Sequence, residues 1–320
     1  MRAARLLFTV LLLLPPAAQS ADFKLAFPVD CTLGQDCIIQ NYVDVDPGSG
    51  WHDYQCGFLS YDGHKGTDIR IRDLRAMDAG VAVLAAADGV VRGIRNDMED
   101  RQPDTTYEAY LEKHSGKECG NGVVLVHGDG FQTQYCHLMK GSVAVKKGDR
   151  VRQGDVLGSI GLSGKTQFPH LHLSVRRGKE VVDPFKGACG GTGSYLWMDD
   201  MGYTDTQLLK FGFADGSQTL DSIELGVAPH SGADSPALVF WVNVVGIRQG
   251  DIQEGTIRGP DGNLLVSNSQ IIEKSKVNWL SYVGKKRPQG GWPRGIYTAV
   301  YFLQRDGAPI IEQETSMRIE

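Results

Sequence analysis

The chain has 320 residues, a formal net charge of −5, and 41% hydrophobic against 22% charged residues. This balance is typical of a folded globular protein of about two domains. The acidic net charge and the lack of a long basic tract argue against a nucleic-acid partner. The 40 glycines indicate many turns between short strands.

The N-terminus has the pattern of a secretory signal peptide. Arg2 and Arg5 precede an apolar run over residues 6–14, and small residues lead to a cleavage site before Ala21. The apolar run is shorter than the ~20 residues that a membrane-spanning helix needs. Residues 1–20 are therefore expected to be removed on export, which places the mature chain in the periplasm or outside the cell.

The cysteines agree with export to an oxidising compartment. Six follow the predicted cleavage site: Cys31, Cys37, Cys56, Cys119, Cys136 and Cys189. An even number in an exported chain predicts three disulfides, for which fifteen pairings are possible. Cys31 with Cys37 is the most local pair. The chain has no CxxC motif, so a cysteine zinc site is not favoured.

The first part of the mature chain is predicted to be rich in β-strands. Residues 21–50 form an N-terminal strand segment that includes the run FKLAF, and residues 51–195 contain short strands between glycine turns. In the clearest hairpin, residues 121–138, alternating apolar runs flank a His-Gly-Asp-Gly turn. Little of this region has helical periodicity.

One polar insertion interrupts this pattern. Residues 98–117 are predicted to hold one short helix near residues 107–113. An insertion between strands usually forms a surface loop, and in some proteins a lid over a site.

The C-terminal part, residues 196–320, follows a glycine-rich join and differs in character. Seven or so strand-like runs, including QTLDSIELG at residues 218–226, occur at regular spacing and are separated by turn signals. This spacing predicts an immunoglobulin-like β-sandwich. Its tryptophans, Trp241, Trp279 and Trp292, are interpreted as core or rim residues.

Four histidines and one aspartate lie in patterns that indicate chemistry. His64 precedes Asp68 by four residues, His137 lies on a predicted strand, and His170 and His172 are two residues apart. Residues two apart on a strand point to the same face, so His170 and His172 project together. A catalytic zinc takes three protein ligands and leaves a position for the water that attacks a carbonyl. Because no HExxH motif occurs, such a site would be built on strands.

The motifs GHKGTD, YCHL and HLH, in this order on β-rich sequence, resemble the lysostaphin-like (LytM-type) zinc metallopeptidases. These enzymes cut peptide bonds in bacterial cell-wall peptidoglycan. The resemblance covers residues 62–185 and includes the phrases GNGVVLVHGDG and VKKGDRVRQGDVLGSIGLSG. It implies an all-β fold, in which an antiparallel sheet forms a groove for an extended peptide.

The resemblance also implies a role for each motif residue. One Zn²⁺ per chain would be held by His64, Asp68 and His172. His137 and His170 would form the catalytic pair. Which of the two acts as the base is left open. No motif residue is missing, which favours a zinc endopeptidase over a non-hydrolytic wall-binding or regulatory protein. A secreted protease acting on other proteins or on other bacteria's walls would have the same fold.

The remaining candidates receive structural interpretations. His127 is assigned to a turn, and Asp183 is expected to cap a turn or end a strand. Strand alternation predicts that Cys136 points away from the site, and a structural disulfide involving Cys119 and Cys136 is favoured over a thiol ligand. Two groups complete the set: His52, His114 and His230 as solvated side chains, and Trp51, Tyr54 and Tyr61 as packing residues. By fold-level analogy, the C-terminal domain is expected to contact the wall or a partner protein.

Overall fold

The computed structural model describes residues 22–101, 106–189, 195–224, 226 and 232–320. The predicted signal peptide, residues 1–20, and His230 lie outside these ranges. Within them, no helix is long and apolar enough to cross a membrane.

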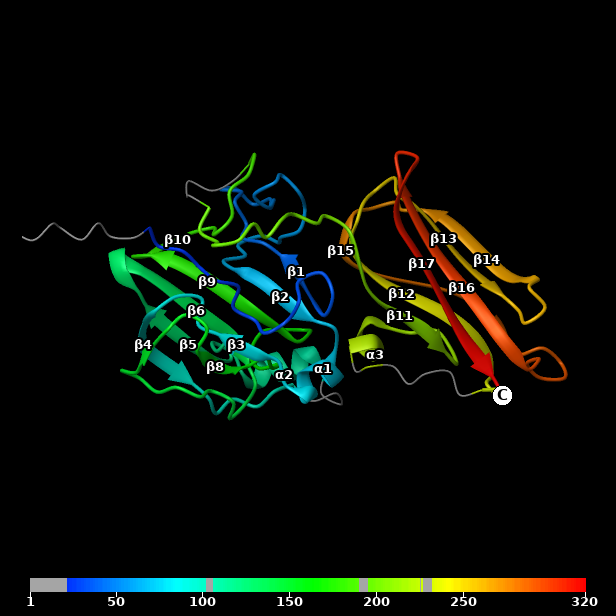
Figure 1. Ribbon diagram of the computed structural model, residues 1–320, viewed down its shortest axis with the longest axis horizontal. Coiled ribbons are helices and arrows are strands. Elements are labelled where there is room, and N and C mark those ends of the chain that lie inside the picture. Colours follow the sequence, from blue (N-terminus) through cyan, green and yellow to red (C-terminus); the bar gives the residue numbers. More distant parts are fainter. Residues whose placement is uncertain (1–21, 102–105, 190–194, 225, 227–231) are drawn as a thin grey trace, which may run out of the picture.

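An antiparallel sheet of eight strands forms the first part of the described chain (Figure 1). Its order is β1-β2-β9-β6-β5-β4-β7, and β10 pairs with the end of β9. The strands are β1 Cys37–Asn41, β2 Thr67–Ile71, β4 Gly89–Arg95, β5 Asn121–Val126, β6 Phe131–Leu138, β7 Arg150–Val151, β9 His170–Arg177 and β10 Glu180–Val181. A separate pair consists of β3 Ala82–Leu84 and β8 Val156–Ser159.

The sheet buries one face and keeps polar side chains on the other. Ile69 on β2 and Leu171 and Leu173 on β9 are fully buried in a common apolar core. His170 and His172 alternate with these leucines on β9, as the sequence predicts, and therefore share the opposite face.

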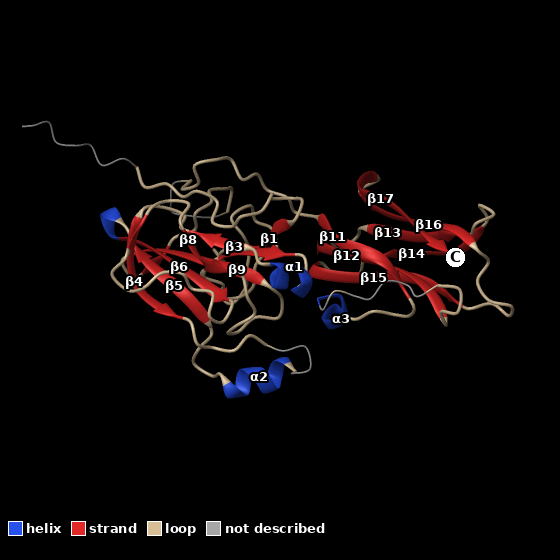
Figure 2. Cartoon of the chain, turned by 60° about the horizontal axis from the view of Figure 1, so that its bottom comes forward, coloured by secondary structure: helices blue, strands red, loops and turns tan. Residues whose placement is uncertain are grey.

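Helices are few among the described residues, and the sequence predicts only one of them. The helix α2 (Tyr107–Lys113) occupies the predicted position in the insertion and stands away from the sheet (Figure 2). The helix α1 (Leu74–Ala79) begins after Asp73, whose carboxylate accepts a hydrogen bond from the Ala76 amide at 3.0 Å. This N-cap is the local reason for a helix in a short stretch without clear periodicity. The predicted strand FKLAF forms only an isolated bridge, from Leu25 to Trp197.

All six cysteines are paired, as export predicts. The disulfides are Cys31–Cys37, Cys56–Cys189 and Cys119–Cys136. The Cys56–Cys189 bond joins residues 133 positions apart, so it restricts the unfolded chain strongly.

The second part contains seven strands in two antiparallel sheets. One sheet has the order β11-β12-β15 and the other β14-β13-β16-β17. Their bounds are β11 Gln207–Ala214, β12 Ala237–Ile247, β13 Ile252–Arg258, β14 Leu264–Ile271, β15 Lys276–Lys286, β16 Gly295–Arg305 and β17 Ala308–Ile319. Both sheets contribute to one apolar cluster, for example Phe240 on β12 with Tyr301 and Leu303 on β16. The immunoglobulin-like class and the boundary at residue 196 stay predictions, and Trp197 packs in the first core.

The predicted strand at residues 218–226 is wrong, because the helix α3 (Leu220–Glu224) lies there. The Thr219 hydroxyl accepts a hydrogen bond from the Ser222 amide at 3.1 Å, and the Ser222 hydroxyl accepts one from the Thr219 amide at 2.9 Å. This reciprocal capping fixes a helix start. Trp241 and Trp292 are buried as interpreted.

The two parts meet through a buried cluster of charges beside α3. The Arg70 guanidinium, fully buried, binds Glu224 at 2.6 Å and the Gln40 amide oxygen at 2.6 Å. The Lys210 ammonium lies 3.3 Å from the second Glu224 oxygen and donates to the Arg72 carbonyl oxygen at 2.7 Å. One carboxylate from the second part therefore neutralises a cation on β2 and another on β11.

Asp183, in the segment after β10, caps a turn as predicted. One of its oxygens accepts a hydrogen bond from the Phe185 amide at 3.0 Å, and the other has no partner among the described residues. Burial, with a smaller contribution from the neighbouring Asp53 carboxylate, raises the pKa of Asp183 to about 7. The folded chain therefore favours the neutral acid.

We expect Glu224→Ala to lower the free energy of unfolding by about 3 kcal/mol or more, because two buried cations lose their common partner. Urea denaturation measures this change. Asp221→Ala removes an exposed carboxylate from the same helix and should change the value by less than about 0.5 kcal/mol. Similar small losses for both variants would contradict the role assigned to the buried cluster.

Asp183 should also make stability depend on pH. Between pH 3.8, the ordinary pKa of an Asp carboxyl group, and about pH 7, its pKa in the folded chain, the folded chain keeps a proton that the unfolded chain has released. The free energy of unfolding therefore falls as the pH rises through this window, by up to about 4 kcal/mol. In urea denaturation, the free energy of unfolding of Asp183→Asn should rise relative to that of the wild type between pH 5 and pH 8. Asp97→Asn, at an exposed site, should show no such change. A pH-independent difference for Asp183→Asn would refute this.

Candidate metal centre

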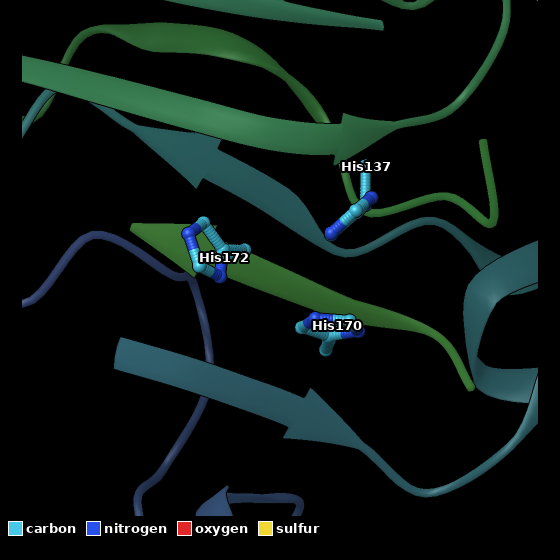
Figure 3. Close-up of side chains that lie close together, drawn as sticks. All are labelled: His137, His170 and His172. Carbon is cyan, nitrogen blue, oxygen red and sulfur yellow. The ribbon is translucent and has the colours of Figure 1, made fainter. Parts of the chain in front are cut away.

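The register of the sheet places the predicted site residues together. On neighbouring strands β2 and β9, Asp68 is directly opposite His172 and Arg70 is opposite His170. His64 lies in the loop that enters β2, and His137 lies near the end of β6. Figure 3 shows the histidines of β6 and β9 directed toward a common space.

His64, Asp68 and His172 form a tight triangle of polar atoms. The His64 Nε2 atom lies 3.1 Å from Asp68 Oδ1 and 3.2 Å from His172 Nδ1, and His172 Nδ1 lies 2.8 Å from Asp68 Oδ1. His64 and Asp68 are almost fully buried. The three atoms therefore meet with little access for solvent.

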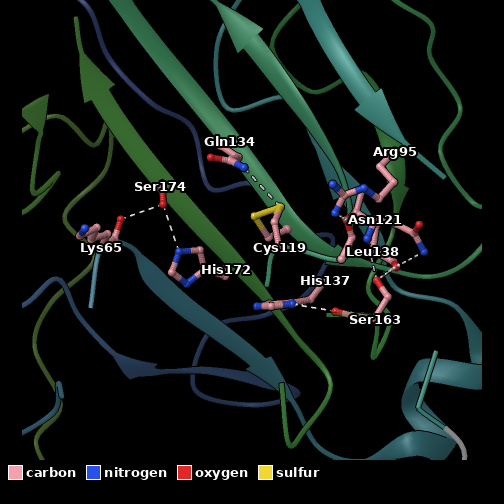
Figure 4. Close-up of a disulfide and its surroundings, with 12 residues drawn as sticks. Lys65, Arg95, Cys119, Asn121, Gln134, His137, Leu138, Ser163, His172 and Ser174 are labelled. Atoms are coloured by element: carbon pink, nitrogen blue, oxygen red, sulfur yellow. Dashed lines mark hydrogen bonds between the residues drawn. A yellow bond between two sulfur atoms is a disulfide. The ribbon is translucent and has the colours of Figure 1, made fainter. Parts of the chain in front are cut away.

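Hydrogen bonds on the far side of each ring fix the tautomers. The His64 Nδ1 atom lies 2.7 Å from the Tyr42 carbonyl oxygen, which can only accept, so Nδ1 carries the proton. The Ser174 hydroxyl donates to the Lys65 carbonyl oxygen at 2.7 Å and lies 3.0 Å from His172 Nε2, so that nitrogen donates to it (Figure 4). Both inner nitrogens, His64 Nε2 and His172 Nδ1, consequently present lone pairs.

The triangle thus brings two nitrogen lone pairs and a carboxylate oxygen together without a proton between them. This arrangement is repulsive unless a cation shares it. Ligands about 2.0–2.1 Å from a tetrahedral zinc ion lie about 3.3 Å from one another, close to the 2.8–3.2 Å observed. The donor set therefore fits a zinc ion, with His64, Asp68 and His172 as ligands.

Two further histidines border the triangle. The His137 Nδ1 atom donates to the Ser163 carbonyl oxygen at 2.8 Å, and His170 Nδ1 lies 2.9 Å from the Phe168 carbonyl oxygen. Their rings are 4.7 Å apart, and His170 Nε2 lies 3.4 Å from Asp68 Oδ1. Each ring therefore turns its Nε2 edge to the site.

A second set of three possible ligands overlaps the first. His137, His170 and His172 also bring one nitrogen each within 4.8 Å of the others, as do the members of the first set. Both sets include His172, so geometry alone leaves two ways of holding one ion. The tautomers and the carboxylate favour the set with Asp68.

Electrostatics keep the site ready for a metal. Burial opposes ionisation of Asp68, but the nearby His64 and His170 rings outweigh it and hold the carboxyl pKa well below its usual value. Burial lowers the pKa of His137, helped by His170 and His172, and burial also lowers the pKa of His172. Both rings are thus neutral at pH 7, the form that binds metal or accepts a proton.

His64 differs from the other two rings. Burial lowers its pKa, but Asp68 beside it outweighs burial, so the net shift is upward. Gly66 of the first motif has a packing reason, because a Cβ atom there would lie 2.5 Å from His172 Nε2. The loop that carries His64 can therefore approach β9 only with glycine at this position.

The prediction that Cys136 points away from the site is wrong. Cys136 is directly opposite His172 across β6 and β9, and such paired residues point to the same face. His137 has a φ of 65°, so regular alternation ends there and both neighbours border the site. The predicted disulfide with Cys119 is confirmed and holds the end of β6 beside the histidines (Figure 4).

The sequence reasoning missed the residues that orient the ligands. Ser174 could have been found, because it lies two residues after His172 on the same strand face. The carbonyl groups of Tyr42 and Ser163 carry no sequence signal. Tyr110 of the insertion is buried and its hydroxyl accepts from the Gly164 amide at 3.0 Å, which ties α2 to the loop behind His137.

The other histidines have structural contacts away from the centre. His127 lies 2.7 Å from the Asp88 carbonyl oxygen and 2.8 Å from the Thr133 hydroxyl, which confirms its turn role. His114 contacts the Tyr110 carbonyl oxygen in its own helix, and His52 lies 3.5 Å from Asp46.

The three aromatic residues before the first motif differ in burial. Tyr54 is buried, as a packing residue should be. Trp51 and Tyr61 are each 51% exposed, so these two side chains are not the buried packing residues that the sequence predicts. The Tyr61 ring stacks on the His64 ring with centroids 4.3 Å apart.

Comparisons with known proteins match the part of the chain that carries the candidate metal ligands. Residues 62–184 match the model of Peptidase family M23. The chain is 34% identical over 119 residues to the peptidoglycan DD-endopeptidase ShyA of Vibrio cholerae, which covers 37% of this chain and 21% of that protein. It is 33% identical over 129 residues to the cell division protein DipM of Caulobacter vibrioides, and the match covers 40% of this chain and 18% of that protein. The chain thus spans about a fifth of the length of these relatives.

Among solved structures, the catalytic domain of the M23 protein EnpA of Enterococcus faecalis matches with a TM-score of 0.33 and 20% identity, over 51% of this chain and 96% of that one. The family match begins at Asp62 and ends at Pro184, so it contains both proposed ligand sets and the whole of β9. Residues 62–184 therefore match a Peptidase family M23 domain, the LytM-type that the motifs resemble.

Proposed function

We propose that this chain is a zinc-dependent endopeptidase that hydrolyses peptide bonds in bacterial cell-wall peptidoglycan. The observation that carries the proposal is the convergence of lone pairs from His64 and His172 on the Asp68 carboxylate. Relatives named peptidoglycan DD-endopeptidases support the substrate class. The complete site argues against the non-hydrolytic alternative.

In this proposal, His64, Asp68 and His172 hold one zinc ion per chain. A bound zinc ion supplies a water molecule of lowered pKa and polarises the scissile carbonyl group. The far-side hydrogen bonds to the Tyr42 carbonyl oxygen and the Ser174 hydroxyl keep the ligand rings in the required tautomer and orientation.

His137 and His170 form the proposed catalytic pair. Each holds its Nδ1 proton on a backbone carbonyl oxygen, so each presents Nε2 to the substrate. One neutral ring can accept the proton of the attacking water and pass it to the leaving amine. The other, when protonated at Nε2, can donate a hydrogen bond to the developing oxyanion. The geometry permits either assignment.

The remaining assignments follow from this activity. We place the mature enzyme in the periplasm or outside the cell, where its substrate and its three disulfides belong. The peptidase domain comprises residues 51–195. The C-terminal domain, residues 196–320, contacts the wall or a partner protein.

Zinc content distinguishes the two possible ligand sets. Mature wild-type protein should contain about one zinc per chain by atomic emission, and His64→Ala and Asp68→Ala should lose it. His137→Ala should retain it, because His137 lies outside the favoured set. His52→Ala serves as the control for a histidine outside the site. Zinc retained in His64→Ala but lost in His137→Ala would assign the second set.

Digestion of purified peptidoglycan tests the activity. We expect the mature protein to release soluble peptide-containing fragments, a chelator to abolish the release, and added zinc to restore it. His137→Ala should lower the rate by about 100-fold or more, because it removes one proton-transfer or oxyanion group. Mass spectrometry of the fragments identifies the cleaved bond. Unchanged release in the presence of chelator would refute the proposal.

A further inference from the structure

The sheet face that carries the metal centre continues beyond it along β6 and β9. Cys136 is opposite His172, Gln134 is opposite Ser174, and Gln132 is opposite Arg176. These cross-strand pairs point to one face, so they form a ladder that leads away from the histidines. Figure 4 shows its first rungs, with Gln134 and Ser174 beside His172.

A pocket of about 320 Å³ lies over the far rungs of this ladder. Its polar lining consists of two arginines, two glutamines and a serine: Arg92, Arg176, Gln132, Gln134 and Ser174. Among the residues that the structure describes, no carboxylate lines it. Ser174 also contacts His172, so the pocket lies next to the candidate metal centre.

The two arginines are available for a ligand. Arg92 donates to the Gln132 amide oxygen at 2.9 Å, which directs it toward the ladder. The Arg176 Nε atom is buried and has no hydrogen-bond partner within the described ranges. Neither arginine forms a salt bridge with a described residue. A buried, unpaired guanidinium nitrogen is costly, so the described residues do not fully satisfy this guanidinium group.

We propose that this pocket, hereafter the arginine pocket, binds a carboxylate group of the peptide substrate. A guanidinium group presents parallel N–H donors that match a carboxylate, and the neutral amides can supply further donors. The inference rests on the proposed peptidase function, because it assigns a substrate group to the same groove.

The position of the arginine pocket sets which carboxylate it can receive. Arg176 follows His172 by four residues on β9, a separation of about 13 Å at the rise of a strand. An extended substrate peptide rises at a similar rate per residue. The bound carboxylate therefore belongs to a residue about four positions from the scissile bond, or to a nearer residue with a long side chain.

The chain provides a matched control on the same strand. Arg177 directly follows Arg176 but points to the opposite face, where its guanidinium lies 5.2 Å from the centre of the Phe131 ring. Its Nε atom donates to the Asp129 carbonyl oxygen at 3.2 Å. Arg177→Gln therefore removes the same charge from the same strand without changing the arginine pocket.

Equilibrium binding tests the arginine pocket separately from catalysis. The full mature chain, loaded with zinc and carrying His137→Ala to prevent turnover, is titrated against two fluorescent stem peptides by anisotropy. One peptide has free carboxylates and the other has them converted to carboxamides; mass spectrometry confirms that both stay intact. We expect the carboxylate peptide to bind roughly tenfold more tightly, with a preference that weakens as salt is added.

The arginine variants then locate the preference. Arg176→Gln and Arg92→Gln should each bring the ratio of the two affinities close to one, and Arg177→Gln should leave it unchanged. Equal affinities in the parent protein, no binding of either peptide, or an equal loss in Arg177→Gln would overturn the proposal.

Failure of the peptidase function would look different. In that case the parent protein would discriminate between the peptides as expected, while the wild type would release no fragments from peptidoglycan. Conversely, wall digestion with no preference for the carboxylate peptide would refute the arginine pocket and leave the peptidase proposal intact.

Discussion

The site depends on one electrostatic constraint, which is that three electron-pair donors face one another across about 3 Å. The fold maintains this unfavourable arrangement by holding the outer edge of each imidazole. His64 is fixed through the Tyr42 carbonyl oxygen, and His172 is fixed through Ser174 and the Lys65 carbonyl oxygen. Because both outer nitrogens carry protons, neither ring can relieve the repulsion by turning a proton inward. The repulsion is relieved by a positive charge at the inner edge, either a proton on His64 Nε2, whose pKa Asp68 raises, or a metal ion shared by the three atoms.

Sheet register converts distant parts of the sequence into this constraint. The pairing of β2 with β9 sets Asp68 opposite His172, and a shift of either strand by one residue would turn its site residue toward the apolar core. Residues such as Ile69 and Leu171, which are fully buried beneath the site, therefore specify the metal centre as well as the core. The Cys119–Cys136 disulfide fixes the end of β6, where the left-handed φ of His137 turns its ring toward the same space.

The sequence predicts those features that repeat with a simple period or are local. Alternation on β9 predicts that His170 and His172 share a face, and the hairpin at residues 121–138 appears as β5 and β6. Prediction from the sequence fails where a single residue breaks the strand period, as His137 does next to Cys136. It also fails where a few polar side chains cap a helix in a stretch of strand-like composition, as at α3. Backbone carbonyl groups that orient imidazole rings belong to residues of any type, so the structure is needed to identify them.

The contact between the two parts of the chain also reaches residues that border the candidate metal centre. Arg70 is opposite His170 on the neighbouring strand, and its guanidinium lies 4.3 Å from the centre of the Phe168 ring. The Phe168 ring in turn packs against the His170 ring, and the Phe168 carbonyl oxygen accepts a hydrogen bond from His170 Nδ1. Glu224 of α3 holds Arg70 by a buried ion pair at 2.6 Å. A displacement of α3 would therefore move Arg70, which contacts the Phe168 ring that packs against His170. The seven-stranded part is thus joined to the proposed catalytic pair through a buried charge.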